Sequence, residues 1–187
     1  MRERASRDEV AVDWVRLELD VDAFDEARFA PYLQACQVAG IEFTTLAELG
    51  DTTEHRRELW ALNRTCSADI PDRGEFYTLE QYVAERIETP SFDPSGVALA
   101  IDGDGWVGMA TTSLHPTRGF AFSEMTGVLP SHRGRGLSLA LKLLAVRFTR
   151  SRDLHWLRTF HHPRNVSAIA MNRRLGFVDE DPHRWPS

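Results

Sequence analysis

Residues 126–139 read Thr126-Gly-Val-Leu-Pro-Ser-His-Arg-Gly-Arg-Gly-Leu-Ser-Leu139, and this stretch decides the fold. Before it, residues 120–129 mix aromatic, β-branched and aliphatic side chains, which predicts a half-buried strand that Pro130 ends. After it, apolar residues recur at helical spacing from Leu137 to Phe148, which predicts an amphipathic helix ending near Arg150. A glycine-rich loop therefore connects a strand to the N-terminus of a helix.

This loop has the properties of an anion-binding site. The first N–H groups of a helix lack intrahelical acceptors and carry the positive end of the helix dipole, which favours a phosphate. Gly134 and Gly136 have no Cβ to hold an anion away and can adopt backbone conformations closed to other residues. The arginines beside them add charged donors. We therefore expect an anion to be bound by Arg133, Gly134, Arg135, Gly136, Leu137 and Ser138.

Two common phosphate-binding motifs do not fit the loop. A P-loop requires Lys and then Ser or Thr after its last glycine, whereas Leu137 and Ser138 follow Gly136. A dinucleotide fingerprint requires Gly or Ala at the position of Leu139. The sequence excludes both motifs.

The loop closely resembles the acetyl-CoA loop of the GNAT superfamily of N-acetyltransferases. Residues 128–137 fit the family variant Val-x-Pro-x-x-Arg-Gly-x-Gly-[Leu/Ile]. Downstream, Asn165 and residues 171–177 (Met-Asn-Arg-Arg-Leu-Gly-Phe) resemble a second family motif, in which a helix leads to Gly-Phe and a strand. The alternative is an ordinary strand, loop and helix with two surface arginines.

The resemblance implies a GNAT fold of the α/β (α+β) class. Its central sheet is mixed and mostly antiparallel, with helices on both faces and a strand pair that splays apart at the CoA site. Acetyl-CoA would be the cosubstrate, with its pyrophosphate on the loop. Val128 would pair with the pantetheine and polarise the thioester carbonyl through its backbone N–H, and Asn165 would contact the pantetheine arm. We expect no metal, because the adjacent His161 and His162 point to opposite sides of a strand.

The resemblance also implies an activity, the acetyl-CoA-dependent transfer of an acetyl group directly to the primary amine of a small molecule. A CoA-binding module without transferase activity and an N-acetyltransferase of proteins or peptides remain alternatives. Glu124 is the candidate base, because it lies four residues before Val128 on the predicted strand and so on the same face. His115 and His161 are weaker candidates.

The acceptor wall in this family is formed by two early helices and the loop between them. Here the helices correspond to residues 46–62 and to a segment that starts at residue 78 with a Thr78–Gln81 capping box and ends before residue 90. The loop spans residues 63–77. We expect substrate contacts from this loop at Asp69, Asp72, Glu75, Phe76 and Tyr77.

Composition and charge limit the remaining classes. No signal peptide and no run of about 18 apolar residues occurs, so we expect a cytoplasmic protein that does not bind membranes. Cys36 and Cys66 lie far apart without metal-type spacing, and we expect both to be buried as apolar residues.

The charge is unevenly distributed along the chain. Residues 1–129 carry 11 Lys+Arg against 24 Asp+Glu, and residues 130–187 carry 11 against 4. The basic part suits a CoA site, and the acidic part would attract a cationic amine. One short basic loop is a poor footprint for nucleic acid, so we expect none as a partner.

Other elements follow from periodicity and turn residues. We expect strands at residues 10–19, 41–45, 96–101, 106–114, 156–160 and from 177, and helices at 23–39 and 168–174. Residues 1–40 would form an N-terminal extension of one strand and one helix, and residues 41–187 a GNAT domain that resembles one module of the tandem-type members.

Two features depart from the family pattern. Only ten residues follow Phe177, where the family has room for two final strands. We therefore expect residues 14–19 to pair into the sheet, from the same chain or from a partner in a homodimer. Many members also carry a tyrosine general acid at the position of Asn172, and an amide cannot donate a proton in that role.

Overall fold

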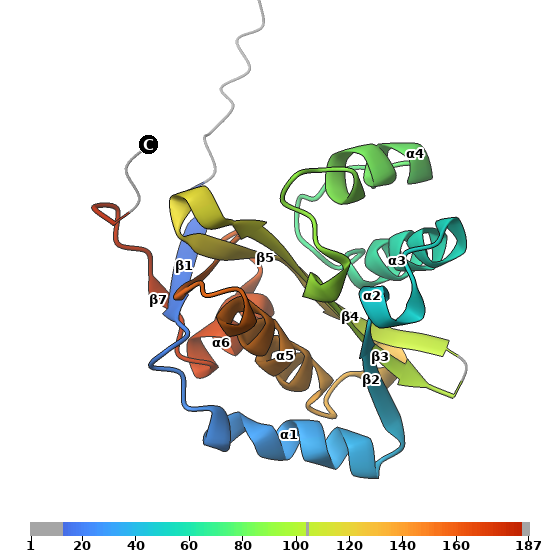
Figure 1. The fold of residues 1–187 in the computed structure, drawn as a ribbon, viewed down its shortest axis with the longest axis horizontal. Helices are drawn as coiled ribbons and strands as arrows, with labels where there is room; N and C mark the ends of the chain where they lie inside the picture. Colours follow the sequence, from blue (N-terminus) through green and yellow to red (C-terminus); the bar gives the residue numbers. More distant parts are fainter. Residues whose placement is uncertain (1–12, 104, 185–187) are drawn as a thin grey trace, which may run out of the picture.

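Seven strands form one sheet in the order β2-β3-β4-β5-β6-β1-β7, in a computed structural model that describes residues 13–103 and 105–184 (Figure 1). Only β5 and β6 pair in parallel among these strands. The strands are β1 (Val15–Asp20), β2 (Ile41–Thr45), β3 (Val97–Asp102), β4 (Gly105–His115), β5 (Phe120–Val128), β6 (Trp156–His161) and β7 (Val178–Asp179). The predicted mixed, mostly antiparallel sheet is confirmed.

The helices match the predicted segments with shifted ends. They are α1 (Glu26–Val38), α2 (Leu46–Leu49), α3 (Thr53–Cys66), α4 (Leu79–Tyr82), α5 (Leu137–Ser151) and α6 (Val166–Arg174). The single helix predicted over residues 46–62 is wrong, because Gly50 with φ +94° ends α2 and Thr52 caps a new helix. The capping box of Thr78 and Gln81 is confirmed, and after α4 the chain continues in a π-helical turn to Ile87.

β1 lies inside the sheet, between β6 and β7. It pairs antiparallel with β6 from Val15–His161 to Asp20–Trp156, and with β7 through Leu17 and Glu18. The prediction that residues 14–19 enter the sheet is therefore confirmed for β1, and the strand comes from the same chain. The expected start of this strand at residues 10–12 lies outside the described part. Because the chain supplies this strand itself, the reason for expecting a homodimer disappears, and the dimer stays a prediction.

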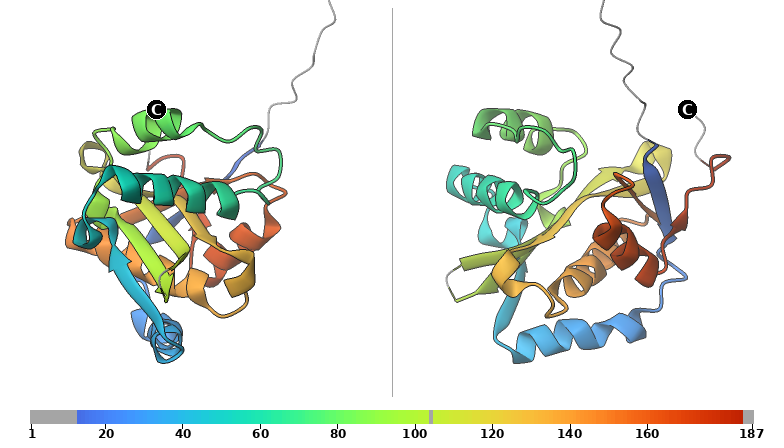
Figure 2. Two further views of the ribbon diagram at one scale, coloured as in Figure 1. Left: turned by 90° about the vertical axis from the view of Figure 1, so that its right-hand side faces the viewer. Right: turned by 180° about the vertical axis from the view of Figure 1, so that it is seen from behind.

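Helices cover the two faces of the sheet as two separate layers (Figure 2). On one face, α5 packs on β4 and β5, and α1 packs across α5. On the other face, α2, α3 and α4 enclose a smaller core with Leu59, Tyr82, Leu99 and Met109. The site described below lies where the sheet opens between these layers.

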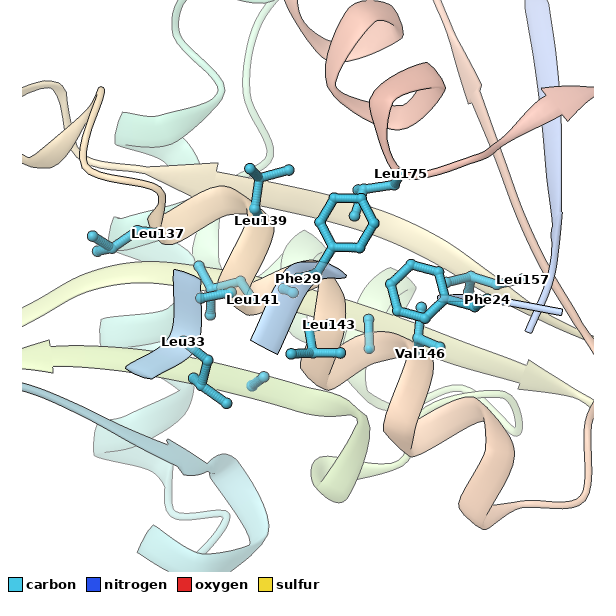
Figure 3. Close-up of a cluster of buried hydrophobic side chains, with 14 of the residues drawn as sticks. Phe24, Phe29, Leu33, Leu137, Leu139, Leu141, Leu143, Val146, Leu157 and Leu175 are labelled. Atoms are coloured by element: carbon cyan, nitrogen blue, oxygen red, sulfur yellow. The ribbon is translucent and has the colours of Figure 1, made fainter. Parts of the chain in front are cut away.

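α1 buries its aromatic side against α5 (Figure 3). Phe24, Phe29 and Leu33 are buried beside Leu143 and Val146 of α5. Each such side chain contributes about 1.5–3 kcal/mol when fully buried. Residues on both sides of position 40 thus share one core, and the predicted division of the chain at that position stays a prediction.

No helix within residues 13–103 and 105–184 combines the length and the apolar character needed to cross a membrane.

Gly127 marks the closest approach of β5 to α3. A Cβ at this position would overlap the Cβ of Cys66 and lie 3.0 Å from Met125 Cε. Gly127→Ala is therefore expected to lower the free energy of unfolding by about 1–3 kcal/mol, because α3 must move away from the sheet. Urea unfolding measures this. Gly105→Ala is the control, since its Cβ would find its nearest atom at 3.7 Å, and equal losses in both variants would contradict the packing argument.

α5 is buried almost all round because α1 covers the side that faces away from the sheet. On the side of α5 that faces β5, Lys142 is only 2% exposed, and its Nζ donates a 2.6 Å hydrogen bond to Ser123 Oγ. Burial lowers the pKa of Lys142 to about 7. Between that value and the ordinary lysine pKa of about 10.4, the unfolded chain holds a proton that the folded chain lacks.

Unfolding therefore takes up a proton in this range, and raising the pH stabilises the fold. We expect the wild type to gain stability relative to Lys142→Met by up to about 1.4 kcal/mol per pH unit above neutrality. Urea unfolding of both proteins across this range is the measurement. Parallel pH profiles would show that Lys142 keeps its ordinary pKa in the folded chain.

Candidate active site

The site begins where β5 and β6 separate. Their ladder covers only Phe120–Phe122 and Trp156–Arg158, and Thr159 Oγ1 then donates a 3.1 Å hydrogen bond to Ser123 O. Beyond this link β6 continues along β1, and the predicted splay of the strand pair is confirmed. A cavity of about 980 Å³ opens in the gap, lined by β5, β6, the starts of α5 and α6, and the loop after α3.

One edge of β5 faces this cavity with free backbone groups. Leu129 N–H donates to Val107 O at 2.9 Å, toward β4. Since backbone directions alternate along a strand, the N–H of Val128 points to the opposite, open edge. Val128 O accepts a 3.1 Å hydrogen bond from Arg133 Nε. An extended ligand that carries amide groups can therefore pair with this edge of β5 as an added strand would.

The predicted loop follows directly and ends at the N-terminus of α5. Gly136 is the N-cap, with φ +85° and no side-chain cap. Gly134 has φ +76°. Within the described residues, no group accepts a hydrogen bond from the backbone N–H groups of 134–138. The loop thus presents a row of donors at the positive end of a helix, as an anion requires.

The two glycines of the loop differ in their surroundings. A Cβ on Gly134 would meet nothing within 4 Å, whereas one on Gly136 would lie 2.9 Å from Tyr32 Cδ1 in α1. Cys36, also in α1, donates its thiol to Arg135 O at 3.7 Å. Gly136 therefore allows the loop to rest on α1, and Gly134 keeps the space in front of the loop open.

The two loop arginines also differ. Arg133 Nη1 forms a 2.7 Å ion pair with Asp69 Oδ2, so this predicted acceptor contact instead lies against the loop. Arg135 forms no ion pair with any described residue. Asp72 reaches the other wall of the cavity and pairs with Arg164 and, at 3.2 Å, with His162. The acidic loop after α3 thus spans the cavity mouth.

The other predicted acceptor residues all line the same cavity. Phe76 packs on the ring of Tyr82, with centroids 6.1 Å apart. Tyr77 accepts a 2.8 Å hydrogen bond from Arg86 Nη2 through its hydroxyl. Glu75 is exposed at the rim.

Sequence analysis missed an aromatic rim on the opposite side of the cavity. Phe160 lies between Trp14 and Phe122, with both ring centroids at 5.3 Å. The alternation of β6 could have indicated that Phe160 faces away from α5.

Glu124 lies in the cavity but not on the face that we predicted. The register of β5 shifts by one residue, because Thr111 is opposite Met125 and Thr112 is opposite Ser123, which leaves Glu124 in a β-bulge. The prediction that Glu124 shares a face with Val128 is therefore wrong. Val128 packs in the core under α5, whereas Glu124 turns toward α3 and α4.

A hydrogen-bonded network holds the Glu124 carboxylate. Oε1 accepts from Ser113 Oγ at 2.6 Å, and Oε2 pairs with Arg86 Nη1 at 3.4 Å. The Ser113 hydroxyl also lies 3.2 Å from His115 Nε2, and burial lowers the pKa of that imidazole, opposed by Glu124. The carboxylate is thus oriented on the α3 and α4 side of the cavity, with Arg86 as a partner that the sequence did not indicate.

A second polar group lies on the α5 side of the cavity. Lys142, Ser123, His161 and Asn172 all line it. Asn172 is fully buried and its Nδ2 contacts His161 Nε2 at 2.8 Å, while its Oδ1 has no hydrogen-bond partner. Burial, and then the charge of Lys142, lower the pKa of His161 to about 4. Lys142 was missed, although it is the single lysine among 22 basic residues.

Asn165 begins α6 at the cavity wall. Its backbone N–H donates to His162 O at 2.8 Å, and its side chain caps no N–H of α6. Its Oδ1 accepts a 3.4 Å hydrogen bond from Ser167 Oγ, so the Nδ2 group remains available to a ligand.

The cysteines do not contribute a nucleophile. Cys66 lines the cavity, but burial raises its thiol pKa to about 11, and burial also raises that of Cys36. Both are buried, as predicted. Among the described residues, no group of three or more potential His, Cys, Asp or Glu ligands could hold a metal.

Comparisons with known proteins agree with this geometry. Residues 56–177 match the model of the acetyltransferase (GNAT) family. A mycothiol acetyltransferase of Pseudarthrobacter chlorophenolicus is 34% identical over 130 residues, which cover 67% of this chain and 38% of that protein. The chain thus spans less than half the length of this relative.

Solved structures share the fold. A tandem GNAT protein from the clavulanic acid biosynthesis pathway superposes with a TM-score of 0.60 at 20% identity, over 90% of this chain and 50% of that one. An aminoglycoside N-acetyltransferase in complex with CoA gives 0.57 at 17% identity, over 75% and 90%. Since the family model matches more than half of the chain, this protein belongs to the acetyltransferase (GNAT) family.

Proposed function

We propose that this chain is an acetyl-CoA-dependent N-acetyltransferase that moves the acetyl group directly to the primary amine of a small molecule. The observation that carries the proposal is one continuous cavity that combines the unsatisfied N–H groups of residues 134–138, the free edge of β5 and the Glu124 carboxylate. The transfer needs a site that binds the phosphates of the cosubstrate, a groove that orients its thioester, and a base that accepts the proton of the amine.

The residues present suit acetyl-CoA as the cosubstrate. The loop N–H groups would hold the pyrophosphate, because they are donors with no acceptor among the described residues. The exposed Arg135 does not line the cavity and would add positive charge from beside the loop. Val128 N–H would donate to the thioester carbonyl or the pantetheine, and Asn165 would contact the pantetheine arm. The bound thioester supplies an activated acetyl carbon.

Glu124 would accept the proton of the attacking amine. It faces α3 and α4, where the acidic loop and Tyr77 line the cavity, so the amine would enter from that side. Carboxylates there attract an ammonium group, and Glu124 would then take its proton directly or through water. The names of two relatives, mycothiol acetyltransferase and aminoglycoside N-acetyltransferase, refer to small molecules and support this acceptor class.

A CoA-binding module without transferase activity is the alternative that one observation favours. Asn172 occupies the position of the usual tyrosine acid and is fully buried against His161. Acetyl-CoA binding without turnover of any amine would support this alternative. Activity on peptides but not on free amines would instead indicate a protein or peptide N-acetyltransferase.

Gly134→Glu tests the cofactor site. The variant places a carboxylate in the open space before the loop N–H groups, so we expect about 100-fold weaker acetyl-CoA binding, equivalent to roughly 2.8 kcal/mol, by titration calorimetry. Gly119→Glu is a matched control, since Gly119 has the same φ of +76°, equally open surroundings and a place outside the cavity. Equal affinities of the wild type and Gly134→Glu would remove the loop from the cofactor site.

Glu124→Gln tests the base. The amide keeps the size of the side chain but cannot accept a proton, so we expect kcat to fall by about 10²–10⁴ while acetyl-CoA affinity is unchanged. A thiol-release assay over a panel of amines measures this. Glu88→Gln is the control, because Glu88 pairs with Arg56 outside the cavity. Retention of full kcat in Glu124→Gln would assign the proton transfer to another group.

A further inference from the structure

Lys142 is a buried cation without a counter-ion. Its Nζ donates one hydrogen bond, to Ser123 Oγ at 2.6 Å, and lies 5.2 Å from the centroid of the Phe177 ring. No carboxylate of the described residues pairs with it. An ammonium group has three donors, so two of them lack a partner in a side chain that is 2% exposed. Such a group is costly unless something else pairs with it.

The cavity is where a partner can reach Lys142. Lys142 and Ser123 both line it, beside the last link between β5 and β6. His161 and Thr159 from β6 and Asn172 from α6 line the same cavity. Of these only His161 titrates, and its pKa of about 4 keeps it neutral near pH 7. Thus no group from the packed elements supplies the missing negative charge.

Acyl transfer generates an anion in this cavity. When the amine nitrogen forms its bond to the acetyl carbon, the carbon–sulfur bond breaks and its electron pair stays on sulfur. A free thiol has a pKa of about 8.5, so the leaving thiolate gains much from a nearby cation. Asn172 cannot protonate it, and its Nδ2 already contacts His161 Nε2 and donates to Ala168 O at 2.9 Å.

We infer that Lys142 is a catalytic residue whose ammonium group donates a hydrogen bond to the leaving sulfur and holds it as a thiolate. This inference rests on the proposed function. The proton stays on Nζ and the electron pair of the broken bond stays on sulfur. An entering ammonium group first loses one proton through Glu124 to the solvent, and Glu124 then accepts the second proton as the amide forms. Lys142 thereby replaces the tyrosine that the family pattern places at Asn172.

The chemistry of lysine fits this role better than that of arginine. The chain uses arginine at 21 of its 22 basic positions and lysine only here. A guanidinium stays charged under all conditions, whereas a buried lysine can lose its proton when no anion is present. With a pKa of about 7, Lys142 is about half protonated near pH 7 without a ligand, and the charge of a thiolate would shift it to the ammonium form.

The single lysine makes the test direct. In protein labelled with ¹³C-lysine, the only side-chain Cε signal reports the protonation of Lys142, which we would titrate by NMR without ligand, with CoA and with desulfo-CoA, which lacks the sulfur. We expect CoA to raise the pKa of Lys142 by about one unit or more, a tenfold effect, and desulfo-CoA to leave it nearly unchanged. Equal titration curves with the two ligands would overturn the inference.

Binding and spectroscopy provide a second measurement. The wild type should bind CoA about tenfold more tightly than desulfo-CoA and show the ultraviolet absorbance of a thiolate, and Lys142→Met should lose both. Arg147→Met is the matched control, because Arg147 lies on the same helix but pairs with Glu26 outside the cavity. If wild-type protein binds neither CoA nor desulfo-CoA, the proposed function itself fails. If it binds both equally, only the role of Lys142 fails.

Discussion

The separation of β5 from β6 is the constraint on which the rest of the site depends. β6 stays paired with β1 along its whole length, whereas its ladder with β5 ends at Phe122, so β6 follows β1 and diverges from β5 beyond that point. The backbone groups of β5 past that point are then left without a strand partner on one edge. Buried backbone groups require partners, and a ligand that runs along the edge can supply them. The N-terminal strand thus fixes the position of the groove although it contributes no backbone group to it.

The β-bulge at Glu124 divides this groove into two chemically different sides. In a regular strand Ser123 and Val128, which are five residues apart, would face opposite sides of the sheet. With the bulge, both turn toward α5, while Glu124 and Met125 turn toward α3 and α4. The bulge thus directs Ser123, the hydrogen-bond partner of Lys142, to one side of the gap and the Glu124 carboxylate to the other.

The sequence predicted the parts that depend on local chemistry. The glycine loop, the Thr78 capping box and the use of residues 14–19 as a strand all followed from short motifs or from a missing family element. The β-bulge at Glu124 could not be predicted, because its residues include no glycine or proline that would mark a register shift. Lys142 was not predicted as a site residue, because it lies outside the apolar stripe that the helical periodicity marks as buried, yet it is buried and its ammonium group reaches Ser123 of β5. The ion pair of Asp69 with Arg133 was not predicted either, because it joins segments 64 residues apart. Asp69 was therefore assigned to the acceptor from its place in the loop after the first early helix.

Charge pairing across the fold changes what the basic and acidic parts of the chain can do. Several arginines of the basic part are already paired with the acidic part, such as Arg150 with Glu26, Arg164 with Asp72 and Arg133 with Asp69. The pair of Arg133 and Asp69 is exposed, and such pairs stabilise by only about 0–1 kcal/mol. A phosphate carries more charge and can replace Asp69 at little cost. The carboxylate set free would then lie at the mouth through which a cationic amine enters, so cofactor binding would strengthen the field that attracts the acceptor.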